Sequence, residues 1–285
     1  MTDATLAAPS SVPTGQGSPK GPGPVLSLRG AELTLGDRRL WSGLDLDLFP
    51  GEFVAVLGSN GSGKTSLLRA ILGEYGLSAG TGEFLGHPFH RGDPRIGYVP
   101  QHHLSDAGVM MRGRDLVALG LTGHRWGPGW PSPRRRARVD ALLAEVGALA
   151  YADAPVGLLS GGEQQRLRIA QALAADPQLM LCDEPLASLD LRAQAEVVGL
   201  IDAQRRRRGF GVLFVTHDVN PVLEVVDRVL YLGNGRFRIG PPDEVMRSEV
   251  LSDLYGAPVE VIRAGGRIVV VGAPEQPHHP VPRRA

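Results

Sequence analysis

The first residues with evident chemistry form the glycine-rich run Gly58-Ser59-Asn60-Gly61-Ser62-Gly63-Lys64-Thr65, which Ser66 follows. Its spacing, G-x-x-x-x-G-K-[ST], is typical of a loop that wraps the phosphates of a nucleotide. The glycines let backbone N–H groups approach an anion, and a helix that starts here adds its positive end. We expect Lys64 to reach the β- and γ-phosphates and Thr65 to bind Mg²⁺. A chance glycine loop is the alternative, and a strand pattern before it and a helix pattern after it disfavour that alternative.

Two acids, Asp183 and Glu184, follow the apolar run Leu179-Met180-Leu181-Cys182. An apolar strand of this kind ends at the edge of a parallel sheet where ligands bind. We expect Asp183 to lie beside Mg²⁺ and Glu184 to polarise a water molecule. Two acids after a strand can also simply begin a turn. The presence of the glycine-rich run in the same chain is what favours a role for this pair at a nucleotide site.

The run Leu159-Ser160-Gly161-Gly162-Glu163-Gln164-Gln165-Arg166 narrows the class. Ser160 is a good helix N-cap, and the paired glycines expose backbone N–H groups at the start of a helix, where an anion is favoured. This run resembles the signature motif of ATP-binding cassette (ABC) proteins. The resemblance implies that Ser160, Gly161, Gly162 and Glu163 contact ATP held by the phosphate loop of a second cassette, and that two cassettes pair head to tail.

Further matches to this family occur in the family's order, from about Val25 to Asp243. Gln101 resembles the lid glutamine, Ser188-Leu189-Asp190 the D-loop and His217 the switch histidine. The resemblance implies that Gln101 and His217 act with Glu184 in ATP hydrolysis, and that Thr65, Gln101 and Asp183 hold Mg²⁺. The chain departs from the family at Leu35, where an aromatic ring often stacks on adenine, so we expect weaker discrimination between bases.

The pattern of elements predicts an α/β fold. Strand-like and helical segments alternate, as in a parallel sheet covered by helices. By resemblance the core is a P-loop NTPase with a RecA-like parallel sheet, an N-terminal antiparallel β subdomain and an inserted helical subdomain. The expected parts are a disordered leader (1–24), the ATPase domain (25–256, with its helical subdomain at about 101–160), a C-terminal β-hairpin (257–273) and a disordered tail (274–285).

Composition limits the possible partners. Lysine plus arginine equals aspartate plus glutamate, at 30 each, so the chain lacks the basic excess that nucleic acid demands, and we expect no nucleic-acid partner. The cluster Arg205-Arg206-Arg207-Arg208 is interpreted as the solvated end of a helix. The chain has a single cysteine, Cys182, which is consistent with a reducing compartment. We interpret Cys182 as a small residue buried in a strand. The pair His278-His279 lacks the ligand set of a defined metal site.

No run of about 18 apolar residues occurs, so any transport must use the pathway of another chain. The sequence after His217 resembles that of cassettes from bacterial manganese and zinc importers. The resemblance includes Asp218-Val219-Asn220-Pro221 and the hairpin that ends in Arg267-Ile268-Val269-Val270-Val271. The resemblance implies a cassette dimer, a homodimer by expectation, at the cytoplasmic face of the membrane, with integral membrane permease subunits and an extracytoplasmic solute-binding protein. Importers of ferric siderophores or cobalamin, an exporter, and a non-transport ABC ATPase remain alternatives.

Overall fold

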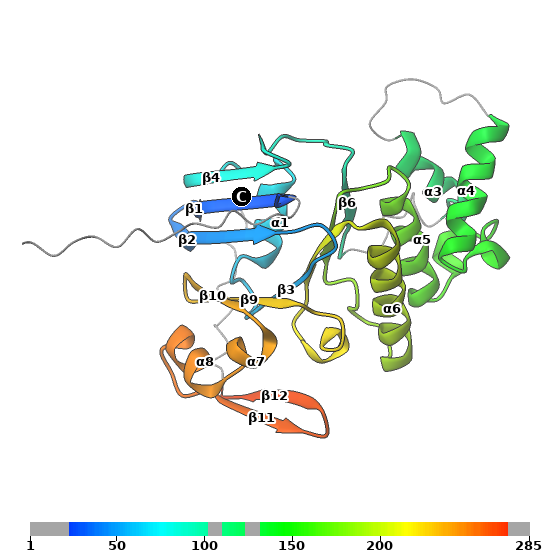
Figure 1. Ribbon diagram of the computed structural model, residues 1–285. Helices are drawn as coiled ribbons and strands as arrows, with labels where there is room; N and C mark the ends of the chain where they lie inside the picture. The colour runs from blue at the N-terminus through cyan, green and yellow to red at the C-terminus, as the bar shows by residue number, and fades with distance from the viewer. Residues whose placement is uncertain (1–22, 102–109, 123–131, 273–285) are drawn as a thin grey trace, which may run out of the picture.

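The computed structural model describes residues 23–101, 110–122 and 132–272. Most of the expected leader and all of the expected tail, including His278 and His279, lie outside the described residues. Figure 1 shows the described chain as layers of sheet and helix, with the N-terminal strands at one side and helices α3 to α6 at the other.

A six-stranded sheet forms the centre of the fold. Five of its strands are parallel, and the edge strand β10 runs antiparallel to β9. In spatial order the strands are β10 (Arg236–Gly240), β9 (Arg228–Gly233), β3 (Phe53–Gly58), β8 (Gly211–Val215), β7 (Leu179–Asp183) and β6 (Ile96–Val99). Strands β3, β7 and β8 are apolar almost throughout because both faces of this sheet are covered.

A second, four-stranded antiparallel sheet lies next to it (Figure 1). Its strands in spatial order are β2 (Arg38–Leu48), β1 (Leu26–Leu35), β4 (Ala79–Phe84) and β5 (His87–Pro88). Apolar and polar residues alternate through Leu44-Asp45-Leu46-Asp47-Leu48, and the leucines are buried while the aspartates are not. One face of this sheet therefore packs inward and the other meets solvent.

Helices cover the sheets and form a separate helical region. The helices are α1 (Lys64–Ile71), α3 (Gly113–Thr122), α4 (Pro133–Glu145), α5 (Gly161–Leu173), α6 (Leu191–Arg208), α7 (Pro242–Val245) and α8 (Ser248–Tyr255). Short 3₁₀ turns occur at Leu149–Tyr151, Val156–Leu158 and Asn220–Val222. Figure 1 shows α3, α4 and α5 grouped at one end of the molecule. No described helix has the length and apolar character needed to cross a membrane.

Two hydrophobic clusters fill the two faces of the central sheet, as β3 illustrates. Phe53, Ala55 and Leu57 join a cluster with residues of the helical region and of α5 and α6. Val54 and Val56, which point the other way, join a cluster with the antiparallel sheet and α1. The predicted α/β class with a covered parallel sheet is confirmed.

The C-terminal segment forms a two-stranded antiparallel hairpin of β11 (Glu260–Ala264) and β12 (Arg267–Val271). Gly265 and Gly266 make the turn, each with positive φ (57° and 75°), a conformation that costs glycine little. In Figure 1 this hairpin lies beyond α7 and α8, at the C-terminal end of the described chain.

The arginine cluster at the end of α6 differs from its interpretation as a solvated helix end. The side chain of Arg205 is 7% exposed and pairs with Asp202 and Asp227. Arg208 is 15% exposed and pairs with Glu145 and Asp176. Arg206 and Arg207 are more than half exposed. Carboxylates from distant parts of the chain neutralise this helix end, and spacing along the sequence alone did not show them.

Candidate functional site

Four loops converge at the carboxyl edge of the central sheet. The strands β3, β8, β7 and β6 are neighbours and parallel, with Val56 opposite Val215, Val215 opposite Asp183 and Cys182 opposite Val99. Because parallel strands end at the same edge, the loops that follow them lie together. These loops carry, in spatial order, Lys64, His217, Glu184 and Gln101.

The glycine-rich loop is shaped by two glycines. Gly58 has φ +144°, and a Cβ there would lie 2.1 Å from the carbonyl oxygen of Leu232, so no larger residue fits. Gly63 is the N-cap of α1 in a left-handed conformation, without a side-chain cap. The first N–H groups of α1 therefore have no capping side chain, and Ser62 Oγ is buried without a hydrogen-bond partner. Backbone and hydroxyl donors free in this way are what a phosphate group needs.

Lys64 is buried within this loop. Its Nζ donates to the carbonyl oxygens of Gly58, at 2.8 Å, and Ser59, at 3.0 Å. Burial lowers the pKa of Lys64, while the charges of Glu184 and Asp183 act in the opposite sense. An ammonium held here by carbonyls alone is ready to exchange them for the stronger acceptors of a phosphate.

Asp183 ends β7 and faces α1. The hydroxyl of Thr65 donates to Asp183 Oδ1 at 3.0 Å, and the Tyr98 hydroxyl donates to Oδ2 at 3.4 Å. Burial is the main cause that raises the pKa of Asp183, and the charge of Glu184 adds to it. Burial and the neighbouring Asp183 raise the pKa of Tyr98 to about 12. A desolvated carboxylate next to a hydroxyl is a site that a hard cation would relieve of its excess negative charge.

Glu184 has a strained backbone, with φ +46° in a non-glycine residue. Its N–H donates to the carbonyl of Val215 at 3.0 Å, which ties it to the next strand. Oε2 accepts from Gln101 Nε2 at 3.0 Å and lies 4.0 Å from His217 Nδ1. A carboxylate turned out of its strand and held between an amide and an imidazole is placed for proton transfer.

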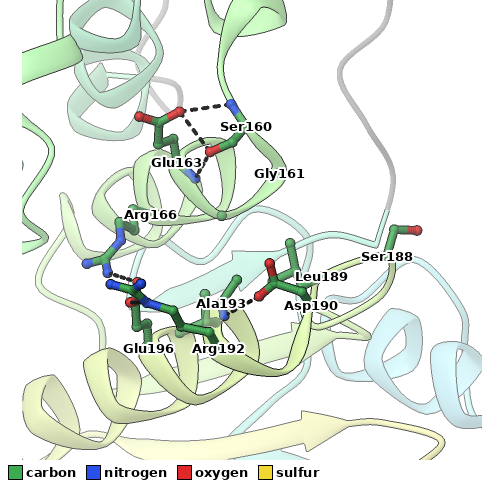
Figure 2. A pocket seen from close by; sticks show the side chains of 12 residues that line it. Ser160, Gly161, Glu163, Arg166, Ser188, Leu189, Asp190, Arg192, Ala193 and Glu196 are labelled. Atoms are coloured by element: carbon green, nitrogen blue, oxygen red, sulfur yellow. Dashed lines mark hydrogen bonds and ion pairs between the residues drawn. The ribbon is translucent and has the colours of Figure 1, made fainter.

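The signature-like run forms a second site, shown in Figure 2. Ser160 caps α5 through a capping box: Ser160 N and Oγ both donate to Glu163 Oε2 at 2.8 Å, and Glu163 N donates to Ser160 Oγ at 3.4 Å. The expectation that Ser160 is an N-cap is confirmed. Asp190 caps α6 by accepting from the N–H of Ala193 at 2.8 Å.

The starts of α5 and α6 line an open cavity of about 350 Å³. None of its lining residues belongs to the glycine-rich loop; they include Ser160, Gly161, Gly162, Glu163 and Asp190. Figure 2 shows Arg166 of α5 and Arg192 of α6 both turned to Glu196 of α6 at this cavity. The described chain therefore separates the predicted residues into two groups, one around Lys64 and Glu184 and one around Ser160.

Sequence reasoning missed Tyr98, whose hydroxyl reaches Asp183 from the strand before Gln101. It also missed the left-handed backbone of Glu184 and of Ser188, with φ 46° and 64°. The contact of Tyr98 and the backbone of Glu184 depend on pairing between strands far apart in the chain, so no local pattern signals them. Leu35 ends β1 before Gly36 and is 37% exposed, so it offers an apolar surface without an aromatic face.

Comparison with known proteins defines the class of this fold and site. Residues 41–187, slightly more than half of the chain, match the ABC transporter family. The chain therefore belongs to this family. It is an ATP-binding subunit and an ATPase, as the glycine-rich loop and the signature-like run predict.

Among its relatives are proteins named for import. The zinc import ATP-binding protein ZnuC of Halorhodospira halophila is 33% identical over 82% of this chain and 84% of that protein. ZnuC of Pseudomonas putida is 36% identical over 79% and 80%. The phosphonates import ATP-binding protein PhnC of Anaeromyxobacter dehalogenans is 38% identical over 90% of this chain but only 53% of that protein.

Solved structures agree with the fold. A metal-chelate type ABC transporter in an inward-facing conformation is 27% identical, with a TM-score of 0.74, over 87% of this chain and 96% of that chain. The cbiO1 subunit of the cbiONQ transporter of Clostridium perfringens is 26% identical, with a TM-score of 0.69, over 81% and 94%. The predicted ABC ATPase fold is confirmed.

Proposed function

We propose that this chain hydrolyses ATP to drive uptake of a divalent metal, zinc or manganese, through separate membrane subunits. The observation that supports a metal as the substrate is the similarity to zinc import subunits along about four fifths of both chains. The phosphonate import relative aligns over little more than half of its own length, so it supports the shared cassette more than a shared substrate. Zinc is therefore the first substrate to test, before manganese, ferric siderophores or cobalamin.

The nucleotide site suits Mg²⁺-ATP. The unpartnered Ser62 hydroxyl and the uncapped start of α1 suit phosphate oxygens. The oxygens of Thr65 and Asp183, with that of Gln101, are the ligand type that Mg²⁺ prefers. The bound cation would neutralise charge that develops on the γ-phosphate. Gln101 donates to Glu184 through Nε2, so its amide oxygen is the atom that would join this ligand set.

Hydrolysis would use Glu184 as the base that takes a proton from the attacking water. Lys64 would stabilise charge on the β- and γ-phosphates, and His217 would stabilise the γ-phosphoryl group as it passes from ADP to the attacking water. The 4.0 Å separation of His217 Nδ1 and Glu184 Oε2 supports a shared role at one end of the site. The strained φ of Glu184 keeps its carboxylate at the sheet edge.

Full activity would need a second cassette, an identical copy in this proposal. The cavity at Ser160 and Asp190 is open and contains no residue of the glycine-rich loop of its own chain. A head-to-tail dimer would bring Ser160, Gly161 and Gly162 of one copy to the γ-phosphate bound by Lys64 and Thr65 of the other. Because both copies hold each ATP, nucleotide would favour the closed dimer by its higher affinity for that state.

The proposed assembly contains permease subunits in the membrane, this chain at their cytoplasmic face and a solute-binding protein on the opposite side. We assign residues 25–256 to the ATPase domain, about 101–160 to its helical subdomain and 257–273 to a hairpin extension. The grouping of α3 and α4 away from the central sheet supports the helical assignment (Figure 1). Closure of the dimer would reach the permease through the helical subdomain, which Gln101 joins to the nucleotide site.

Elemental analysis of cells tests this function. Cells that lack the protein are grown at limiting metal and complemented with wild type, Glu184→Gln or Arg206→Ala. Arg206 is 67% exposed at the far end of α6 and serves as the control substitution outside the nucleotide site. We expect wild type and Arg206→Ala to restore cellular zinc or manganese, and Glu184→Gln to leave it low. Unchanged zinc, manganese and iron in all strains would overturn metal uptake.

A further inference from the structure

The loop after β8 is ordered by polar side chains on both sides of His217. Thr216 Oγ1 accepts from the N–H of Asp218 at 3.2 Å and donates to the Asp218 carbonyl at 2.9 Å. Asp218 Oδ1 accepts from Asn220 twice, from the backbone N–H at 2.9 Å and from Nδ2 at 2.7 Å. The backbone of His217 is therefore held firmly, although its side chain is 65% exposed.

Asn220 also pairs with the C-terminal hairpin, 48 residues further along the chain. Its Nδ2 donates to the carbonyl of Ile268 at 2.8 Å, and the Ile268 N–H donates to its Oδ1 at 2.8 Å. The side-chain amide thus makes both hydrogen bonds that a neighbouring strand would make.

The register of the hairpin explains why Ile268 is available for this contact. Ala264 lies opposite Arg267 next to the two-residue turn, and Arg263 lies opposite Ile268. In an antiparallel pair, bonded and non-bonded positions alternate, and the pair that closes a two-residue turn is bonded. The N–H and carbonyl of Ile268 therefore point away from β11, to the outer edge where Asn220 lies.

The space around this contact is partly hollow. A cavity of about 300 Å³ lies between the hairpin and the His217 loop, lined by His217, Asn220, Tyr231, Met246, Ile268 and others. Ile268 itself is buried in the same hydrophobic cluster as Val219 and Val222. The hairpin is thus seated by Ile268, and the directional link from it to the His217 loop is the amide of Asn220.

We propose that Asn220 is a positioning residue for His217, and that its paired hydrogen bonds to Ile268 make the placement of His217 depend on docking of the C-terminal hairpin. This inference rests on the proposed role of His217 in hydrolysis. Asn220 bonds to Asp218 and to Ile268, so it acts through Asp218 and the backbone of the loop. A change at the hairpin would then alter the rate of hydrolysis and leave ATP binding as it is.

Steady-state ATP hydrolysis by the full chain tests the proposal in variants Asn220→Ala and Asn220→Asp. The aspartate keeps an acceptor for Ile268 N–H but loses both Nδ2 donations and sets a carboxylate against Asp218. We expect kcat to fall about tenfold or more in both, because small misplacement of a reacting group is costly, with KM for ATP within about twofold of wild type. Thermal unfolding of each variant checks that it is folded.

The matched control is Asn234→Asp. Asn234 Nδ2 also holds a C-terminal segment, through the carbonyl of Tyr255 at 2.6 Å, but lies on the turn between β9 and β10. We expect its kcat to equal that of wild type. A similar fall in kcat for Asn234→Asp would overturn the proposal, since any loosening of the C-terminal region would then suffice.

A double-mutant cycle separates positioning from general support of the fold. If Asn220 acts through His217, adding Asn220→Ala to His217→Ala causes no further loss of kcat. A loss that adds in full overturns the proposal. Wild-type kcat in His217→Ala would refute the role of His217 itself. Low kcat in His217→Ala, with wild-type kcat in Asn220→Ala, would refute the positioning alone.

Discussion

Arg205 joins three separate parts of the chain near the end of α6. Its Nε and Nη2 donate to Asp202 Oδ1 at 3.0 and 2.6 Å. Its Nη1 donates to Asp227 Oδ2 at 2.8 Å and to the Gly51 carbonyl at 2.7 Å. The guanidinium carbon also lies 5.7 Å from the centre of the Phe53 ring. Replacing Arg205 by alanine removes all of these contacts together.

The cost of Arg205→Ala follows from the burial of its partners. Asp202 is 12% exposed and would keep only the exposed Arg206 as a partner. Breaking a buried ion pair from one side costs about 3–5 kcal/mol, because the remaining charge stays desolvated. Asp227 is half exposed and adds little. At about 2–4 °C per kcal/mol, Tm should fall by roughly 6–20 °C.

Urea unfolding followed by circular dichroism measures this cost, with Arg206→Ala as the control. Arg206 pairs with the same Asp202 from one residue further along, but it is 67% exposed. Exposed pairs contribute about 0–1 kcal/mol, so Arg206→Ala should change the free energy of unfolding little. If the two variants lost the same stability, the argument that burial gives the Arg205 pair its weight would be refuted.

Four further predictions concern the nucleotide site and its surroundings. Gly58→Ala should abolish ATP binding or folding, because its Cβ would lie 2.1 Å from a backbone carbonyl, whereas Gly30→Ala, with nothing within 4 Å, should cost only about 1–2 kcal/mol in urea unfolding. Because the pKa of Asp183 is raised in the folded protein, protonation of this carboxyl at low pH contributes to the free energy of unfolding. This contribution is lost as pH rises through the folded-state pKa. Asp183→Asn should therefore have a higher Tm than wild type at pH 7, with a gap that closes as pH falls into the ordinary range of aspartate. Cys182 is fully buried and its pKa is raised by burial, so a thiol reagent should label it only after denaturation, and labelling of the folded protein would contradict this. Leu35→Tyr should increase the preference for ATP over GTP in competition binding, and an unchanged preference would refute a base-stacking role for this position.

The sequence was sufficient to predict the strands and loops around the nucleotide site because each has a local signal, whereas the strands β4, β9 and β10 and the helices α7 and α8 were not predicted. The apolar runs of β3 and β7 lead into a glycine-rich loop and an acid pair, and parallel strands bring such loops to one edge. The bond from Gln101 to Glu184 joins residues 83 positions apart, and no spacing rule predicts it. The paired hydrogen bonds between the Asn220 amide and the Ile268 backbone depend on the register of the hairpin, which residue types alone do not determine.

The arginine cluster shows the same limit for charges. Four consecutive arginines at a helix end fit the helix dipole, and that argument predicts solvation for all of them. The structure instead buries Arg205 and Arg208 against acids from α4, from the segment after α5 and from the segment before β9. Sequence separates exposed from buried arginines only when the positions of their partners are known.

The most direct test of ATP-driven metal uptake is the initial rate at which cells accumulate labelled zinc. The cells carry, as their only copy, wild type or Glu184→Gln, and manganese or a phosphonate is added as competitor. We expect zinc uptake with wild type, slowed by excess manganese and unaffected by the phosphonate, and none above background with Glu184→Gln. Equal zinc uptake in the two strains would contradict this expectation.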